Sequence, residues 1–270
     1  MAARASEAEH RQANWDPVYD GIATLFVDDP FPFLNLGYVD PARPHAYNAA
    51  ADPQIWERLS EQLYSCTLTG VSVADRAVLE VGSGRGGGSA YVAQSRGPVE
   101  MVGLDRSRKL IEWCSAHHRL PNLRFHHGDA MRLPFADDRF DVVVNVESSH
   151  CYPSRLGFFR EVERVLRPGG IFALADVFLH EGETKRKRLE GELREAGLRI
   201  VDTADITRGV IEARDQVSRS TAFNERLRRV IPSSTAEAEF RQLACFEGTK
   251  RYRALTEGDG AYWRWVAMAK

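Results

Sequence analysis

Short apolar runs alternate along the chain with segments in which apolar residues recur every three or four positions. The runs have the length of buried strands, and the intervening periodicity is typical of amphipathic helices. This alternation predicts an α/β fold with a doubly wound parallel sheet that binds ligands at the carboxyl edge of its strands. The predicted strands lie near 77–81, 99–104, 122–127, 140–146, 170–177 and 199–204, and the predicted helices near 87–95, 107–118, 154–166 and 182–196.

The two flanks of this region carry helical patterns. On the N-terminal side, helices are expected near 6–25 and 46–66, separated by an aromatic, proline-broken segment. On the C-terminal side, the alternation breaks over 206–257, where two or three helices are expected near 208–219, 222–229 and 235–245, before a last strand near 261–268. We therefore predict an N-terminal helical cap (1–70), an α/β core (71–205, completed by 258–270) and a helical insertion (206–257).

The most informative segment joins the first predicted strand to the first helix of the core. It reads Ala-Val-Leu-Glu-Val-Gly-Ser-Gly-Arg-Gly-Gly-Gly over residues 77–88. Glycine at Gly82, Gly84 and Gly86 removes the Cβ atoms, so the backbone can approach a ligand closely. The spacing satisfies both the dinucleotide fingerprint and the loop typical of S-adenosylmethionine sites, and the glycines alone do not decide between these cofactors.

Three acidic residues near the ends of successive strands bear on the choice of cofactor. Glu80 stands two residues before the first glycine, where it would repel a pyrophosphate and attract the α-amino group of S-adenosylmethionine. Asp105 is placed to accept both hydroxyls of a ribose, which either cofactor carries, and Asp129 to accept the exocyclic amine of adenine. Each aspartate also suits a cap or turn. The charge of Glu80 is therefore what favours S-adenosylmethionine.

Five motifs follow one another in a specific order: Val78–Gly86, Gly103–Asp105, Gly128–Ala130, Phe140–Val144 and Leu166–Gly170, the last expected as a helix end and turn. This series resembles the class I S-adenosylmethionine-dependent methyltransferases, and Asn35-Leu36-Gly37-Tyr38 resembles those that modify small molecules such as macrolides, sugars and lipids. The resemblance implies a Rossmann-like sheet of seven strands with the last one antiparallel. It also implies that the helical insertion forms a lid over the acceptor.

The resemblance further implies S-adenosylmethionine as cofactor and S-adenosylhomocysteine as product. Asp105 would bind the ribose, Asp129 with the Ala130 amide would bind adenine, and Asn145 would lie near the methionine moiety. Tyr38 would close over the cofactor, although the family places Trp after this tyrosine and this chain has Val39. The expected cofactor-binding residues are Tyr38, Glu80, Gly82, Gly84, Gly86, Asp105, Arg106, Asp129, Ala130 and Asn145.

A histidine after the fourth predicted strand is the candidate catalytic base. A hydroxyl that accepts a methyl group must lose its proton, and His150 has an ordinary pKa near the working pH. Asp176, at the end of the fifth predicted strand, is expected nearby to orient the ring. By resemblance, sugar O-methyltransferases with a Glu-Ser-x-His pattern use such a pair. The opposing interpretation is a backbone-bonded loop histidine and an aspartate that caps a turn. Together with His180, the pair matches no strong metal motif, so no metal is expected.

Composition excludes several classes of function. The chain has 270 residues, a net charge of -2 and a pI of about 6.5, which gives no basic field for nucleic acid. The sequence shows no apolar run of membrane-spanning length and no signal-peptide core. Its four cysteines lack paired spacing, which favours reduced thiols and a cytoplasmic location. The sequence leaves a homo-oligomer open.

These observations favour methyl transfer to a hydroxyl, or to an activated carbon, of a hydrophobic natural product. Phe223, Phe240 and Phe246 of the helical insertion are expected to suit such an acceptor. Three alternatives remain: a cofactor-binding cyclase without methyl transfer, an NAD-dependent oxidoreductase, and a non-catalytic adaptor. The cyclase would lack a productive base, Glu80 argues against the oxidoreductase, and the adaptor would tolerate loss of His150.

Overall fold

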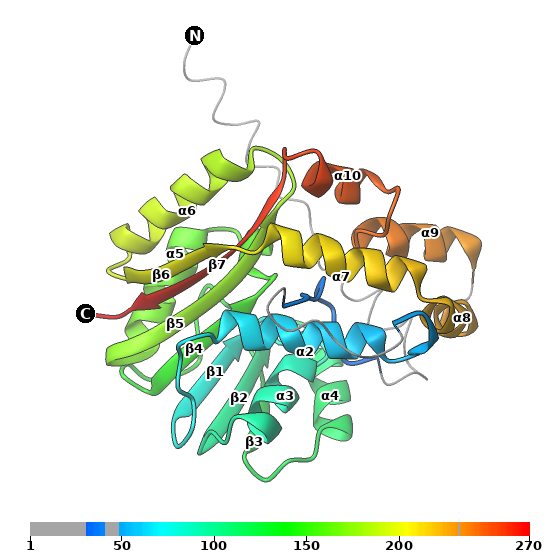
Figure 1. The fold of residues 1–270 in the computed structure, drawn as a ribbon. Coiled ribbons are helices and arrows are strands. Elements are labelled where there is room, and N and C mark those ends of the chain that lie inside the picture. The colour runs from blue at the N-terminus through cyan, green and yellow to red at the C-terminus, as the bar shows by residue number, and fades with distance from the viewer. Residues whose placement is uncertain (1–30, 41–48, 232) are drawn as a thin grey trace.

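The computed structural model describes residues 31–40, 49–231 and 233–270, and in these residues a sheet has helices on both faces (Figure 1). Its strand order is β3-β2-β1-β4-β5-β7-β6. The strands are β1 (Ala77–Val81), β2 (Glu100–Asp105), β3 (Leu123–His127), β4 (Phe140–Val146), β5 (Leu166–Phe178), β6 (Arg199–Asp205) and β7 (Ala261–Met268). The core helices are α2 (Ile55–Thr67), α3 (Gly87–Ser95), α4 (Arg108–His117), α5 (Arg155–Val165) and α6 (Gly182–Glu195).

The direction of the strands places the functional edge. Strands β1 to β5 pair in parallel, whereas β7 is antiparallel to both β5 and β6. The predicted doubly wound sheet with an antiparallel last strand is thereby confirmed. From β1 the chain moves outward through β2 and β3 and then returns to β4 on the other side of β1. The carboxyl ends of β1 and β4 therefore flank a switch point, which is where open α/β sheets bind ligands.

Burial on both faces explains why the core strands are continuously apolar. All five residues of β1 are buried. Val78 packs in the core that includes α2 and α3, and Leu79 packs on the opposite face with α5 and α6. A strand covered on both faces has no solvent side on which polar residues would be stable. Glu80, in the same strand, is fully buried and must therefore find hydrogen-bond donors.

The helical flanks differ in detail from the prediction. The expected helix at 46–66 is a short 3-10 turn (Ala49–Ala51) followed by α2, and its first residues lie outside the described ranges, as does the helix expected at 6–25. The helical insertion contains α7 (Thr207–Arg219), α8 (Thr221–Val230), α9 (Ser234–Leu243) and also α10 (Lys250–Thr256), which we did not predict. The α10 helix is too short to give a clear apolar period, and the Thr249 hydroxyl caps its first turn.

The segment Leu166–Gly170 is a correction to the sequence analysis. We expected a helix end followed by a turn, but α5 ends at Val165 and β5 already begins at Leu166. Phe140 pairs with Leu166 whereas Val142 pairs with Ile171, so the intervening residues form a bulge within the ladder. Gly169 takes a positive φ of 75° in this bulge. The proline and glycines therefore mark an irregular strand start, which sheet pairing maintains.

An aromatic cluster joins the helical insertion to the N-terminal part of the chain. The ring of Phe223 stacks on Trp56 at 5.6 Å between centroids, and Phe240 lies 6.1 Å from Phe31. Phe223, Phe240 and Phe246 are only 0%, 6% and 2% exposed. The expectation that these three rings face an apolar acceptor is therefore wrong for this structure. They stabilise the contact between the insertion and α2 instead.

Candidate active site

A cavity of about 500 Å³ lies at the carboxyl edge of β1, β2 and β4. Its size is ordinary for a site that binds a small molecule or cofactor. The lining includes Pro32–Asn35, Tyr64 of α2, the end of β1 and the loop after it, residues 104–109 at the end of β2, residues 127–130 at the end of β3, and residues 146–148 at the end of β4. The cavity therefore lies at the predicted carboxyl edge, beside the switch point between β1 and β4. Its lining includes Gly82, Gly84, Asp105, Arg106, Asp129 and Ala130.

The glycine loop is shaped by positive backbone angles and by close neighbours. Gly82 has a φ of 76°, and a Cβ atom there would lie 2.0 Å from Ser148 Oγ. Gly84 also has a positive φ, of 53°, and lines the cavity beside Gly82. Gly86 is not among the lining residues; a Cβ there would lie 2.7 Å from the ring of Phe125. Gly82 and Gly84 thus suit a ligand contact, whereas Gly86 allows α3 to start against the sheet.

The two aspartates are held by backbone amides at the cavity. The N–H groups of Gly84 and Ser107 donate to the two carboxylate oxygens of Asp105, each at 2.9 Å. Burial raises the pKa of Asp105 above 3.8, although these donors act in the opposite direction. Asp129 accepts from the Met131 N–H at 2.9 Å. Each carboxylate keeps lone pairs for further donors, so the residues present fit a ribose and an adenine ring.

Glu80 lies behind the cavity and not in its lining. Its carboxylate accepts from the Tyr64 hydroxyl at 2.5 Å and from the Ser89 hydroxyl. Burial raises the pKa of Glu80 to about 7, even though both hydroxyls stabilise the charged form. Tyr64 itself lines the cavity, so its hydrogen bond connects Glu80 to the cavity wall. Sequence analysis missed Tyr64 because its position on α2 carries no local signal.

Two other predicted cofactor residues lie outside the lining. Asn145 is fully buried and donates to the Val81 carbonyl at 2.9 Å, while its amide oxygen accepts from the Ser149 N–H at 3.2 Å. Asn145 thus joins the loop after β4 to β1. The ring of Tyr38 packs against Gly209 of α7, where a Cβ would lie 2.1 Å from it. Asn35, from the same motif as Tyr38, does line the cavity.

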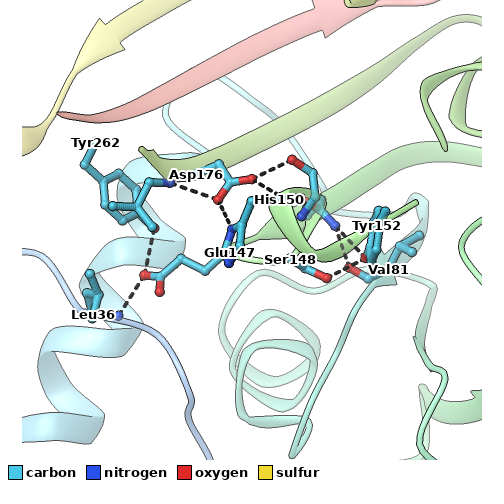
Figure 2. A network of polar contacts seen from close by, with 11 residues as sticks. Leu36, Val81, Glu147, Ser148, His150, Tyr152, Asp176 and Tyr262 are labelled. Atoms are coloured by element: carbon cyan, nitrogen blue, oxygen red, sulfur yellow. Dashed lines mark hydrogen bonds and ion pairs between the residues drawn. The ribbon is translucent and has the colours of Figure 1, made fainter. Parts of the chain in front are cut away.

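The predicted pair His150 and Asp176 is in direct contact (Figure 2). His150 lies in a 3-10 turn (Ser149–Cys151) after β4, and Asp176 lies near the end of β5, which pairs with β4. His150 Nδ1 is 2.6 Å from Asp176 Oδ1, and the His150 backbone N–H donates to Oδ2 at 3.1 Å. Asp176 is fully buried, whereas the His150 side chain is 23% exposed. The cavity lining includes Ser148, just before this turn, and Cys151, its last residue, but not His150 itself.

The electrostatics of the pair favour an imidazolium and a carboxylate. Burial alone would lower the pKa of His150, but the charge and hydrogen bond of Asp176 outweigh it and raise that pKa well above 6.5. Burial opposes ionisation of Asp176 as well, yet His150 and the donors around it lower the pKa of Asp176 below 3.8. The pair therefore favours the charged ring to a higher pH than a free histidine would, and His150 becomes a proton acceptor as the pH rises through its raised pKa.

Glu147 is a residue of the site to which sequence analysis gave no role. Its φ is 48°, an unfavourable angle for a residue with a side chain. Its Oε1 atom accepts from the Leu36 N–H at 2.7 Å and from the Tyr262 hydroxyl at 2.8 Å (Figure 2). Burial raises the pKa of Glu147 above 4.5. Glu147 thus links the N-terminal segment, β4 and β7 at the cavity, through contacts between residues more than a hundred positions apart.

Neither a metal cluster nor a membrane helix is found in the described part of the chain. Within it, no group of three His, Cys, Asp or Glu side chains is placed to hold a metal ion. His180, the third residue of the metal set considered above, contacts Asp259 at 2.6 Å. Among the described helices, none has both the length and the apolar character needed to cross a bilayer.

Several known proteins are similar to this chain in sequence. Residues 79–174 match the family model described as "Methyltransferase domain". The phthiotriol/phenolphthiotriol dimycocerosates methyltransferase of Mycobacterium tuberculosis (strain ATCC 25177 / H37Ra) is 34% identical over 263 residues, which cover 97% of this chain and 94% of that protein. The fatty-acid O-methyltransferase of Mycolicibacterium smegmatis (strain ATCC 700084 / mc(2)155) is 44% identical over 159 residues, covering 59% of this chain and 57% of that protein.

Solved structures show the same fold. The geranyl diphosphate C-methyltransferase of Streptomyces coelicolor A3(2), in complex with Mg2+, geranyl diphosphate and S-adenosyl-L-homocysteine, has a TM-score of 0.67 at 16% identity, covering 94% of this chain and 99% of that one. The [4+2]-cyclase SpnF also has a TM-score of 0.67, at 20% identity, covering 94% of this chain and 93% of the cyclase. At such identities the likeness is one of fold, and it does not distinguish a transferase from a cyclase.

Proposed function

Since the chain belongs to the class I S-adenosylmethionine-dependent methyltransferases, we propose that it methylates a hydroxyl of a hydrophobic, lipid-like acceptor with His150 as the general base. Both curated relatives above are named as methyltransferases of lipids, which supports an apolar acceptor. The cyclase alternative is supported only by a likeness of fold, and the oxidoreductase and adaptor alternatives do not agree with the family. A cytoplasmic location and a homo-oligomeric state stay predictions from the sequence.

The cofactor site is proposed from the cavity lining. S-adenosylmethionine, when bound, supplies a methyl group already activated on a sulfonium. The backbone at Gly82 and Gly84 would approach its methionine and ribose parts, Asp105 with Arg106 would hold the ribose, and Asp129 with Ala130 would bind adenine. Four further residues, Glu80, Gly86, Asn145 and Tyr38, would act through the residues they position. For Glu80, the Tyr64 hydroxyl transmits the effect of the charge.

The contact between His150 and Asp176 is the observation that carries the proposed mechanism. Asp176 accepts the Nδ1 proton of His150 at 2.6 Å, which leaves Nε2 as the basic atom of the neutral ring. The acceptor hydroxyl would give its proton to Nε2 of His150. Its oxygen would take the methyl group as the sulfonium S–CH3 bond breaks, and S-adenosylhomocysteine would leave with that electron pair. The imidazolium that results is stabilised by the buried carboxylate of Asp176. Asp176 stays ionised throughout, so it orients and stabilises the ring without taking the proton.

The helical insertion is proposed to face the acceptor. Its first helix, α7, packs against α2 and β7, and β7 contributes Tyr262, which donates to Glu147 at the cavity. The surrounding side chains would exclude water from the transfer, because an alcohol competes poorly with water in an open site. In this proposal the cofactor binds beside the glycine loop and the acceptor binds beside α7.

The test is methyl transfer from labelled S-adenosylmethionine to hydrophobic hydroxyl acceptors. His150→Ala is expected to lower kcat/KM by about a hundredfold or more, with little change in affinity for S-adenosylhomocysteine. His180→Ala is the matched control, because His180 also contacts an aspartate at 2.6 Å, but its side chain is 71% exposed and outside the cavity lining. Turnover by His150→Ala at the wild-type rate would remove His150 from the mechanism.

A further inference from the structure

The guanidinium of Arg214, on α7 of the helical insertion, is buried in an incompletely paired state. Arg214 is 0% exposed. Its Nε and Nη2 atoms have no hydrogen-bond partner among the described residues, and Nη1 donates to the Ala244 carbonyl at 3.4 Å. The ring of Trp56 lies against the guanidinium, 4.4 Å from its carbon to the ring centroid. One edge of a buried cation is therefore left without an acceptor.

Such an arrangement is unfavourable in the absence of a ligand. Burial lowers the pKa of Arg214 to about 10, so the group is still charged at neutral pH. A buried charge and two buried unpaired donors both cost free energy, and an apolar side chain of similar length would avoid that cost. The unpaired atoms are Nε and Nη2, which together form one edge of the planar guanidinium. That edge is suited to bind the two oxygens of a carboxylate side by side.

The position of Arg214 connects it to the active site. Nη2 lies 3.2 Å from where a Cβ of Gly37 would stand, and the preceding residue, Leu36, donates its N–H to Glu147. Besides burial, the nearby Cys245, Glu147 and Tyr262 side chains affect the pKa of Arg214, so these groups share one buried region. Glu147 lines the cofactor cavity and Arg214 lies on the side of the insertion. A ligand group at the free edge of Arg214 would therefore lie next to the acceptor side of the site.

We propose that Arg214 binds a carboxylate carried by the acceptor, in addition to the hydroxyl that is methylated. This inference rests on the proposed function and narrows the acceptor from neutral lipids to hydrophobic hydroxy acids. Bidentate hydrogen bonds from Nε and Nη2 would supply the missing partners, and the acid would supply the missing counter-charge. Burial raises the pKa of Glu147, which reduces its repulsion of a second carboxylate nearby.

Calorimetry with the full-length chain and S-adenosylhomocysteine tests the site without turnover. The ligands are β-hydroxydodecanoate and its neutral amide, β-hydroxydodecanamide, which differ only in the group that Arg214 would bind. The wild type is expected to bind the acid about tenfold or more tightly than the amide, and Arg214→Met to bind both equally, with Arg214→Lys between them. Arg219→Met is the control, because Arg219 is an exposed arginine of the same helix paired with Glu247. It should keep the preference for the acid.

A purely structural role for Arg214 predicts a different result. If Arg214 mainly stabilised the fold, Arg214→Met would lower the Tm; the proposed site predicts a Tm that is unchanged or higher, because an uncompensated buried charge is removed. Equal binding of acid and amide by the wild type, no binding of either, or a preference that survives in Arg214→Met would overturn the proposal. A labelled methyl donor separates the two proposals: an acid preference without methylation refutes only the proposed function, and methylation without an acid preference refutes only the Arg214 site.

Discussion

Asp176→Asn separates the charge of the buried carboxylate from its shape. Oδ2 accepts hydrogen bonds from the Ser149 hydroxyl at 2.5 Å and the His150 N–H at 3.1 Å. Oδ1 is 2.6 Å from His150 Nδ1 and accepts from the Val177 N–H at 2.8 Å. In asparagine one of these oxygens becomes an NH₂ group. Whichever oxygen is replaced, the new group faces two atoms that the wild type uses as donors.

The cost to stability follows from those contacts. Hydrogen bonds to a charged group contribute about 1.5–3 kcal/mol each, and loss of one partner of a buried pair costs about 3–5 kcal/mol. Two of the four bonds to a residue with 0% exposure are lost, so we expect the free energy of unfolding to fall by about 3–5 kcal/mol. Urea denaturation at neutral pH measures it. A loss below about 1 kcal/mol would contradict the paired, buried state described here.

The pH dependence of catalysis tests the same pair independently. In the wild type, Asp176 holds the pKa of His150 well above 6.5, so kcat/KM should rise with pH through that raised value as the base becomes neutral. In Asp176→Asn the charge of Asp176 no longer raises the pKa of His150; burial still lowers it, and of the groups that raised it Cys151 remains. The rising limb should therefore move to lower pH, and the plateau should fall by about a hundredfold because the ring loses its orientation.

The free energy of unfolding is expected to change with pH in the opposite direction to kcat/KM. Because the folded pKa of His150 lies above the unfolded value near 6.5, its ionic contribution is complete below that pH and is lost as the pH rises through the folded pKa. In the wild type, kcat/KM should rise and the free energy of unfolding should fall over the same range of pH. Asp259→Asn, which alters the exposed contact with His180, should change neither profile. A rising limb that stays in place in Asp176→Asn would refute the reasoning.

Three further substitutions test the cofactor loop and the insertion. Gly82→Ala should abolish binding of S-adenosylhomocysteine in calorimetry, since the added methyl would lie 2.0 Å from Ser148 Oγ at a φ of 76°; wild-type affinity would contradict the loop geometry. Asp105→Ala should weaken the same binding about tenfold to a hundredfold through the loss of about 1.5–3 kcal/mol, and an unchanged affinity would exclude the ribose contact. Phe223→Ala should lower the free energy of unfolding by about 3–5 kcal/mol in urea, because it removes a fully buried ring; a loss below about 1 kcal/mol would contradict that packing.

The parts of the site that the sequence predicted are those set by neighbours along the chain. The glycines after β1 and the aspartates after β2 and β3 fall at strand ends, and a parallel sheet brings such ends to one edge. The same rule predicted the meeting of His150 and Asp176, since each follows or ends a strand of the core. These inferences needed only periodicity, spacing and the known geometry of α/β sheets.

Other features came from pairings that no local pattern encodes. The sequence analysis expected Phe223 to suit an apolar acceptor, but in the structure its ring stacks on Trp56. The bulge before Ile171 depends on the ladder with β4, which a proline and two glycines in sequence do not specify. Both differences arise because the pattern of a strand or helix determines which residues are buried, whereas the neighbouring element determines which side chains they contact.

The sequence by itself determined the strands, the glycine loop and the acids that stand at its edge, because these depend on residues close together in the chain. Only the tertiary structure decided that Glu80 is hydrogen-bonded to Tyr64, that Glu147 joins Leu36 to Tyr262, and that Arg214 is buried with one edge unpaired. The physical reason is that the charge state and stability of a buried polar group depend on its hydrogen-bond partners. Those partners come from segments that become neighbours only when the chain folds.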